Sequence, residues 1–172
     1  MVQSISDIEI RQAVATAAIG IAIVAAYTWL TAYKGLMPDS VLDVRIDAVP
    51  TNAQRIKRLI ENGASNYAVA VYDGTVIGFV NWGKSRNQDF PDGEINAFYL
   101  LKGFNGKGIG RKLFDYAVAQ LKKDGYKTMI VNCLDGNPSI EFYRHMGGKI
   151  VGQREDDVFG HTTKENILQF EI

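Results

Sequence analysis

The stretch "FNGKGIGRKL", residues 104 to 113, constrains the fold of this chain more than any other part of the sequence. Gly106, Gly108 and Gly110 stand at alternate positions, and an apolar pattern of helical period follows directly. Residues 94–101, just before the loop, are typical of a strand. Glycine lets the backbone take positive φ angles and lets another group approach it closely. The sequence therefore predicts a strand, a glycine loop and a helix, in that order.

The glycine loop predicts an anion site at the start of that helix. The first N–H groups of a helix lack partners within it, and the helix dipole is positive at that end. A phosphate or pyrophosphate suits this place, and Lys107, Arg111 and Lys112 add positive charge. The loop is not a Walker A loop, because Ile109 follows Gly108, and the dinucleotide fingerprint would need glycine in place of Arg111. A strand-to-helix turn with solvated basic residues is the alternative.

Strand and helix patterns alternate along the rest of the chain. Segments typical of strands fall at 8–12, 67–72, 75–82, 94–101, 128–134, 149–154 and 166–172. Helices are expected over 12–33, over 52–61, after the glycine loop, and from Asn137, where a cap residue precedes Pro138. The segment 40–50 is ambiguous, and 83–91 and 155–165 are expected to be loops. This order predicts a single domain over residues 1–172, an α/β (α+β) fold with one mixed sheet covered by helices on both faces.

A run without any charged residue, Gln12 to Tyr33, is long enough to cross a bilayer. Its composition argues against a membrane anchor, because eight of its residues are alanine and three are threonine. Its periodicity argues the same way: Ile19, Ile23, Tyr27 and Leu30 share one helical face. No basic stretch precedes it, so a signal peptide is not expected. We expect a core or interface helix, with a membrane anchor as the alternative.

The composition narrows the class of protein. Nineteen basic residues balance nineteen acidic ones, so no overall charge favours nucleic acid or an acidic membrane as a partner. The single cysteine, Cys133, excludes an internal disulfide and lies in an apolar run, where a buried core residue is expected. His145 and His161 are distant in sequence and make no metal-ligand set with it, so no metal is expected. A cytoplasmic location fits these features.

A second motif, "NPSIEFYRHMGG" at residues 137 to 148, lies about 30 residues after the glycine loop. Together the two motifs resemble the core of the GNAT superfamily of acyl-CoA-dependent N-acetyltransferases. The family's loop reads Gln or Arg-x-x-Gly-x-Gly or Ala, and here Asn105 stands before Gly106-Lys107-Gly108-Ile109-Gly110. "AYKGLMPDSVLD" also resembles the early part of many members. The match is strongest over residues 93 to 152.

The resemblance implies a fold and a co-substrate. The fold would be a mostly antiparallel sheet of about seven strands, splayed between the fourth and fifth. The co-substrate would be acetyl-coenzyme A. Its pantetheine arm would lie along the strand Phe98, Tyr99 and Leu100, with a contact from Asn137. Its pyrophosphate would bind the N–H groups from Asn105 to Arg111, a stretch that comprises Asn105, Gly106, Lys107, Gly108, Ile109, Gly110 and Arg111.

The implied reaction moves an acetyl group to a primary amine of a small molecule or a peptide N-terminus. An alkylamine with a pKa of about 10.4 is neutral in only about one molecule in 2,500 at pH 7, a penalty of roughly 4–5 kcal/mol. A carboxylate could accept its proton, and Glu94 is the candidate because strand alternation would place it on the same face as Asn96 and Phe98. Asp92, Asp157 and His161 are the alternatives, and Glu94 could equally be an exposed carboxylate at a strand end.

Two other roles complete the predicted mechanism. A backbone N–H near Phe98 to Leu100 would polarise the thioester carbonyl. Tyr143 is the candidate acid for the departing thiolate, because a phenol is protonated at pH 7. Without the resemblance, Tyr143 would be interpreted as a half-buried aromatic residue of a helix. A non-catalytic acyl-CoA sensor is the alternative function, and a homodimer is expected from the uncharged helix and an exposed edge on the final strand.

Overall fold

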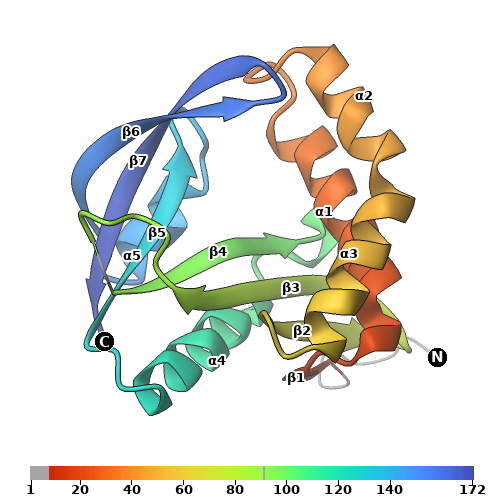
Figure 1. The fold of residues 1–172 in the computed structure, drawn as a ribbon, viewed down its shortest axis with the longest axis horizontal. Helices are drawn as coiled ribbons and strands as arrows, with labels where there is room; N and C mark the ends of the chain where they lie inside the picture. Colours follow the sequence, from red (N-terminus) through yellow and green to blue (C-terminus); the bar gives the residue numbers. More distant parts are fainter. Residues whose placement is uncertain (1–7, 91) are drawn as a thin grey trace.

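The computed structural model describes residues 8–90 and 92–172, so Pro91, at the end of the predicted loop 83–91, lies outside the described residues. A single seven-stranded sheet runs through them in the order β1-β2-β3-β4-β5-β7-β6 (Figure 1). Its neighbours are antiparallel except for β4 and β5, which are parallel. The strands are β1 (Glu9–Gln12), β2 (Asn66–Tyr72), β3 (Thr75–Lys84), β4 (Gly93–Leu100), β5 (Thr128–Leu134), β6 (Lys149–Val158) and β7 (His161–Glu171). The predicted fold class is confirmed.

Helices cover both faces of the sheet, as predicted. One apolar cluster joins α4 to β2, β3, β5 and β7, and another joins α1 and α3 to the opposite face of β2 and β3. Figure 1 shows α4 on one side of the sheet and α1 with α3 on the other. The ambiguous segment 40–50 is mostly helical. The helices are α1 (Ala18–Ala32), α2 (Asp39–Asp47), α3 (Val49–Glu61), α4 (Ile109–Lys123) and α5 (Ile140–His145), with short 3₁₀ turns at Ala15–Ala17 and Lys102–Phe104.

The parallel strands β4 and β5 pair over only a short length. Gly93, Glu94 and Ile95 lie opposite Met129, Ile130 and Val131, and the pairing ends there. β4 nevertheless continues to Leu100 and β5 to Leu134. The predicted splay between the fourth and fifth strands is therefore confirmed, and beyond Ile95 this edge of β4 has no strand partner among the described residues.

A bulge in β4 changes which side chains share a face. Trp82 of β3 lies opposite Ile95, whereas the preceding residue Asn81 lies opposite Ala97, so Asn96 is an extra residue in β4. Strict alternation would place Glu94 on the same face as Phe98, and that prediction is wrong. Glu94 lies opposite Gly83, and Phe98 lies opposite Val80. Because Gly83 and Val80 are three positions apart along β3, the side chains of Glu94 and Phe98 lie on opposite faces of the sheet.

The two closing strands are longer than the sequence indicates. The predicted loop 155–165 is wrong: β6 and β7 form one long hairpin, which turns at Phe159 and Gly160 with φ angles of 51° and 79°. Across the two strands, Arg154 Nε lies 2.8 Å from Glu165 Oε2, an ion pair that supports the pairing.

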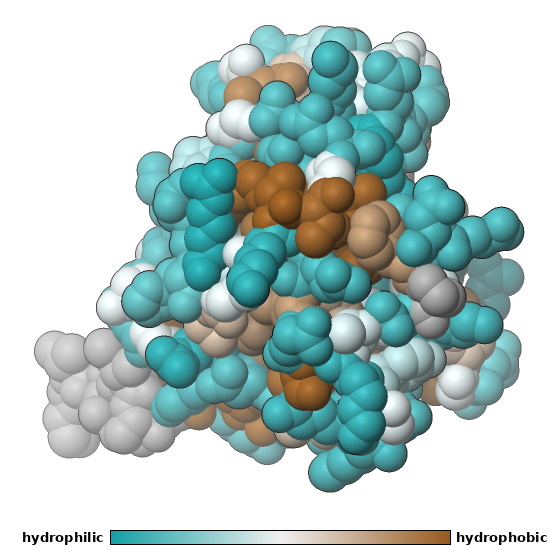
Figure 2. All heavy atoms as spheres, turned by 90° about the vertical axis from the view of Figure 1, so that its left-hand side faces the viewer, coloured by the Kyte–Doolittle hydropathy of each residue, from teal (hydrophilic) through white to brown (hydrophobic). Residues whose placement is uncertain are grey.

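The sheet's outer edge near the C-terminus is β6, and β7 lies between β5 and β6. The prediction that the final strand has an exposed edge is therefore wrong. Val151 is an extra residue in the pairing of β6 with β7, and such a bulge disrupts an edge strand as a template for another chain. The side of the molecule that carries these strands is mostly hydrophilic, with a hydrophobic patch across its middle and smaller ones above and below it (Figure 2).

The uncharged helix α1 packs on the sheet through its small residues. Gly20 lies against Val76 so closely that an added Cβ would come within 2.8 Å of the Val76 Cβ, and Ile21 is fully buried. The face that carries Ile19, Ile23 and Tyr27 points outward instead, with about half of each side chain exposed. Residues 15–32 are long and apolar enough to cross a membrane, but here one side of the helix belongs to the core, as expected.

Candidate functional site

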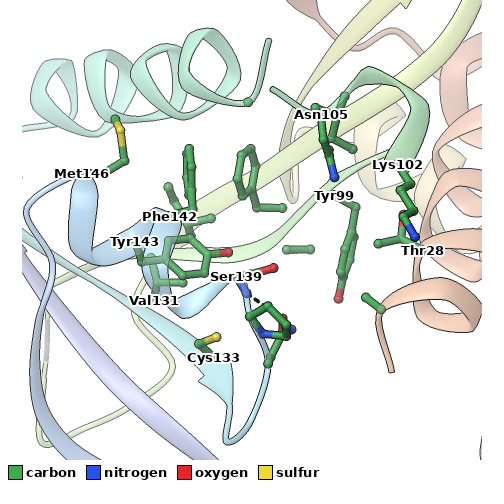
Figure 3. Close-up of a pocket in the computed structure, with 18 of the residues that line it drawn as sticks. Thr28, Tyr99, Lys102, Asn105, Val131, Cys133, Ser139, Phe142, Tyr143 and Met146 are labelled. Atoms are coloured by element: carbon green, nitrogen blue, oxygen red, sulfur yellow. Dashed lines mark hydrogen bonds between the residues drawn. The ribbon is translucent and has the colours of Figure 1, made fainter. Parts of the chain in front are cut away.

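A cavity of about 840 Å³ opens where β4 and β5 separate. Residues from α1, β4, the glycine loop, β5 and α5 line it (Figure 3). Among the predicted site residues, the lining includes Phe98, Tyr99, Leu100, Asn105, Gly106, Gly108, Gly110, Arg111, Asn137 and Tyr143. Glu94, Lys107 and Ile109 do not line it. The structure thus brings the two sequence motifs together on one cavity.

The glycine loop has the backbone conformation on which the predicted anion site depends. Gly106 and Gly108 have φ angles of 73° and 76°, a conformation that other residues rarely adopt, and Gly108 caps α4. In α4 the N–H of Lys112 donates to the Gly108 carbonyl at 3.2 Å, so the N–H groups before it are left free at the helix start. Asn105 differs from the prediction, because its N–H already donates to the Lys102 carbonyl at 3.1 Å.

The side chains around the cradle divide between core and solvent. Ile109 is buried in the core, so only its backbone N–H is available to a ligand. Arg111 is largely exposed and lies 3.7 Å from Asp115, an ion pair that contributes little stability. Lys107 rests over the Phe104 ring, outside the cavity lining. Lys102, which the sequence did not single out, lines the cavity from the 3₁₀ turn before the loop.

Tyr143 projects from α5 with its hydroxyl pointing into the cavity (Figure 3). Its ring is buried and packs against Phe98 and Phe142, with centroid distances of 6.2 and 5.6 Å. Burial raises the pKa of the Tyr143 phenol well above its ordinary value, and the neighbouring Cys133 and Tyr99 act in the same direction. The hydroxyl therefore stays protonated and can donate a hydrogen bond throughout the neutral pH range.

Cys133 lies on β5, and Asn137 lies on the turn that follows this strand. Asn137 Oδ1 accepts a hydrogen bond from the Ser139 N–H at 2.9 Å, but α5 begins only at Ile140, so the predicted helix start at Asn137 is too early. Cys133 is buried, as predicted, and burial raises the pKa of its thiol to about 11. It also lines the cavity, which the sequence did not reveal.

Glu94 is held away from the cavity by three donors. Its side chain is only 1% exposed. The Arg86 N–H donates to Oε2 at 2.8 Å, the Arg86 guanidinium donates to Oε1 at 2.9 Å, and Asn132 Nδ2 donates to Oε1 at 3.2 Å. The hydrogen bond with Glu94 raises the pKa of Arg86. Glu94 therefore does not line the cavity, but it binds Asn132, which does.

The remaining base candidates also lie outside this cavity. Asp92 precedes β4, Asp157 lies near the hairpin turn, and His161 lines a separate, smaller pocket. Within the described part of the chain, no aspartate or glutamate lines the main cavity. No group of three potential metal ligands was found among the described residues either. The lining combines apolar and uncharged polar residues with His145 of α5 and the basic residues Lys102 and Arg111.

Helix α1 forms part of the cavity wall. Thr28, Thr31 and Tyr33 line it from this helix. Trp29 Nε1 donates to the Tyr99 hydroxyl at 3.1 Å, and burial raises the pKa of both Tyr33 and Tyr99. Their hydroxyl groups are therefore neutral at physiological pH.

The turn of the long β6–β7 hairpin contacts α2 through Phe159 and Arg45. The Arg45 guanidinium of α2 lies 3.9 Å from the Trp29 ring centre and 5.1 Å from that of Phe159, at the hairpin turn. Such stacking of a guanidinium on aromatic rings stabilises the contact between distant segments. It joins β6 and β7 to the helices that border the cavity.

Residues 25–147 match a family model described as the acetyltransferase (GNAT) family. A curated relative, the uncharacterized N-acetyltransferase YuaI of Bacillus subtilis (strain 168), is 28% identical over 144 residues, 80% of this chain and 78% of the relative.

Two solved structures share the fold. The PaiA N-acetyltransferase of Thermoplasma acidophilum in complex with coenzyme A has a TM-score of 0.77 at 20% identity, covering 96% of this chain and 99% of that one. A phosphinothricin acetyltransferase of Sinorhizobium meliloti in complex with AcCoA has a TM-score of 0.70 at 24% identity, covering 96% and 89%.

Proposed function

This chain belongs to the acetyltransferase (GNAT) family, and we propose that it transfers the acetyl group of acetyl-CoA to a primary amine by direct attack in a ternary complex. The observation that carries this proposal is the cavity itself. The glycine loop, Tyr143 and the polar residues Thr28 and Thr31 of α1 all line it. A cofactor and an acceptor can therefore meet between β4 and β5.

The residues present fit coenzyme A. The free N–H groups at the start of α4 and the exposed Arg111 suit its pyrophosphate. Beyond Ile95 the edge of β4 that faces β5 has no strand partner, so the amide groups of the pantetheine arm can pair with the backbone of Phe98 to Leu100. Acetyl-CoA supplies an acyl thioester, and every other part of the proposed chemistry is done by this chain.

Tyr143 is the proposed acid. Its hydroxyl is neutral and points into the cavity, where it can donate a proton to the departing sulfur. A backbone N–H between Phe98 and Leu100 is the proposed donor to the developing oxyanion. These two donors act on opposite ends of the bond that breaks.

Glu94, the base predicted from the sequence, receives a different role in this proposal. Its carboxylate already accepts from three donors and does not line the cavity. We assign to it the positioning of Asn132, and the proton of the amine passes to solvent. Asp92, Asp157 and His161 do not line the cavity and receive no role.

The acceptor is a primary amine of a small molecule or a peptide N-terminus. The neutral lining of the α1 end gives no charge-based preference for a polycation. A cytoplasmic location and a homodimer remain predictions, and the outward face of α1, with Ile19 and Ile23, is the surface that a homodimer would use.

The test is free-thiol release from acetyl-CoA against a panel of primary amines, with the mass of each product measured. Acceptor-dependent thiol release and a product 42 Da heavier than its amine, about the mass of an added acetyl group, are the expected results. Binding of acetyl-CoA in a calorimeter with no turnover on any amine would favour the alternative, an acyl-CoA sensor.

A further inference from the structure

Two asparagines stand at the point where β4 and β5 separate. The last paired residues are Ile95 and Val131, and the next residue on each strand is an asparagine, Asn96 and Asn132. Both line the cavity. The side-chain oxygen of each is buried and has no hydrogen-bond partner within the described residues.

Unpaired buried oxygens of this kind call for an explanation. Buried polar atoms in folded proteins are nearly always hydrogen-bonded, because leaving one unpaired costs free energy. Two such atoms on adjacent strands, both belonging to residues that line one cavity, indicate a ligand with two donors. Thr28, across the cavity on α1, has a buried hydroxyl oxygen in the same condition.

The orientation of the Asn132 amide follows from its neighbour. A carboxylate of Glu94 accepts hydrogen bonds and does not donate them, so the amide must turn its Nδ2 group toward Glu94, as it does at 3.2 Å. Its oxygen then points away from Glu94. Arg86 holds Glu94 in place through two further bonds, so this orientation is built into the fold.

Asn96 owes its position to the bulge in β4. It is the extra residue between Ile95 and Ala97, and such bulges re-aim a side chain that regular alternation would direct elsewhere. The bulge occurs one residue after the pairing with β5 ends. The break in the strand and the opening of the cavity thus coincide at Asn96.

We infer that Asn96 Oδ1 and Asn132 Oδ1 accept the two N–H groups of a neutral primary amine, which makes these residues the acceptor-specificity determinants of the proposed reaction. The inference rests on the proposed function. With both N–H groups bound, the lone pair of nitrogen is left for the thioester carbon. The N–C bond forms, the C–S bond breaks, the sulfur takes the proton of Tyr143, and the proton that nitrogen loses returns to Tyr143 through solvent.

The inference predicts discrimination between primary and secondary amines. A neutral secondary amine has one N–H group and leaves one asparagine oxygen unpaired, so the enzyme should prefer the primary amine by about 10- to 100-fold in kcat/KM. The probes are phenethylamine with N-methylphenethylamine, and butylamine with N-methylbutylamine. Within each pair, the ratio of the two kcat/KM values is the quantity measured.

Asn132→Leu and Asn96→Leu each remove one acceptor with little change of side-chain volume. Each should lower kcat/KM for the primary amine by about 10- to 100-fold and bring the ratio toward 1. Asn81→Leu is the matched control, because Asn81 is a buried asparagine of β3 that donates to Ser65 and Asn66 and does not line the cavity. It should keep the wild-type ratio.

The ratio of the two kcat/KM values does not depend on how much of a variant is folded. Where a leucine variant fails to fold at all, Asn132→Ser or Asn96→Ser replaces it. An unchanged ratio in the variants of both positions, with wild-type turnover of the primary amine, would overturn the inference and leave the proposed function intact. Equal wild-type rates on both members of each pair would overturn it as well. Absence of wild-type turnover on every amine would remove the proposed function and this inference together.

Discussion

The indole N–H of Trp29 donates a hydrogen bond of 3.1 Å to the hydroxyl of Tyr99, and this bond ties α1 to β4 beside the cavity. The same Trp29 ring packs at a tilt against Tyr33, with a centroid distance of 4.4 Å, and the Arg45 guanidinium lies over its face. Trp29 therefore joins the first helix to the central strand at this wall of the cavity.

Tyr99→Phe should destabilise the protein, because it leaves the buried indole N–H of Trp29 without an acceptor. The expected loss is about 1–3 kcal/mol, which corresponds to a fall in Tm of roughly 2–10 °C for a domain of this size. Tyr27→Phe on the same helix is the control, because Tyr27 is 49% exposed and should change Tm little. Thermal unfolding followed by circular dichroism measures both, and equal Tm values would show that the bond contributes nothing.

Tyr143→Phe should lower kcat at least tenfold and leave the Kd for acetyl-CoA nearly unchanged. The substitution removes only the proposed proton donor and keeps the ring that packs on Phe98 and Phe142. Tyr116→Phe is the control, since Tyr116 of α4 packs on Trp82 away from the cavity lining. Steady-state rates and calorimetric titration provide the two readouts. Wild-type turnover in Tyr143→Phe would exclude Tyr143 from the chemistry.

Gly108→Leu should abolish binding of acetyl-CoA. The φ angle of 76° strains a leucine there, and its side chain would project beside the N–H groups that are proposed to hold the pyrophosphate. Gly125→Leu, with a φ angle of 92° at the far end of α4, carries a similar strain and should keep the binding site. Calorimetry on both folded variants tests this, and retained affinity in Gly108→Leu would argue against the cradle.

The rate should depend on pH through the amine itself. Because no carboxylate lines the cavity among the described residues, kcat/KM should rise about tenfold per pH unit below the pKa of the amine. The raised pKa of Tyr143 means that its neutral form persists as pH rises, so no falling limb from this residue is expected below about pH 10. Rates on phenethylamine from pH 6.5 to 9.5 measure the slope.

Glu94→Gln, measured over the same pH range, tests the positioning role proposed for Glu94. An amide at this position can no longer impose the orientation of Asn132, so kcat/KM should fall about tenfold or more while the slope against pH stays the same. Under a direct base role the variant would instead change the slope. A lost or altered pH dependence in Glu94→Gln would return the base role to Glu94.

Much of the site could be predicted from short stretches of sequence. The glycine loop and its helix depend on residues that are adjacent in the chain, and they appear where they were expected. Cys133 is buried because an apolar strand surrounds it. The strands over residues 155–165 could not be predicted locally, because each depends on its partner strand, as the pairing of Arg154 with Glu165 shows.

By itself the sequence determined the order of strands and helices, the family, and the glycine-rich start of α4, because these follow from local conformational preferences and from contiguous motifs. Only the tertiary structure decided that Asn96 is an extra residue and that Glu94 binds Arg86 and Asn132. The physical reason is that the register between strands and the contacts of buried polar groups are set by packing between segments distant in the chain, which local patterns do not specify.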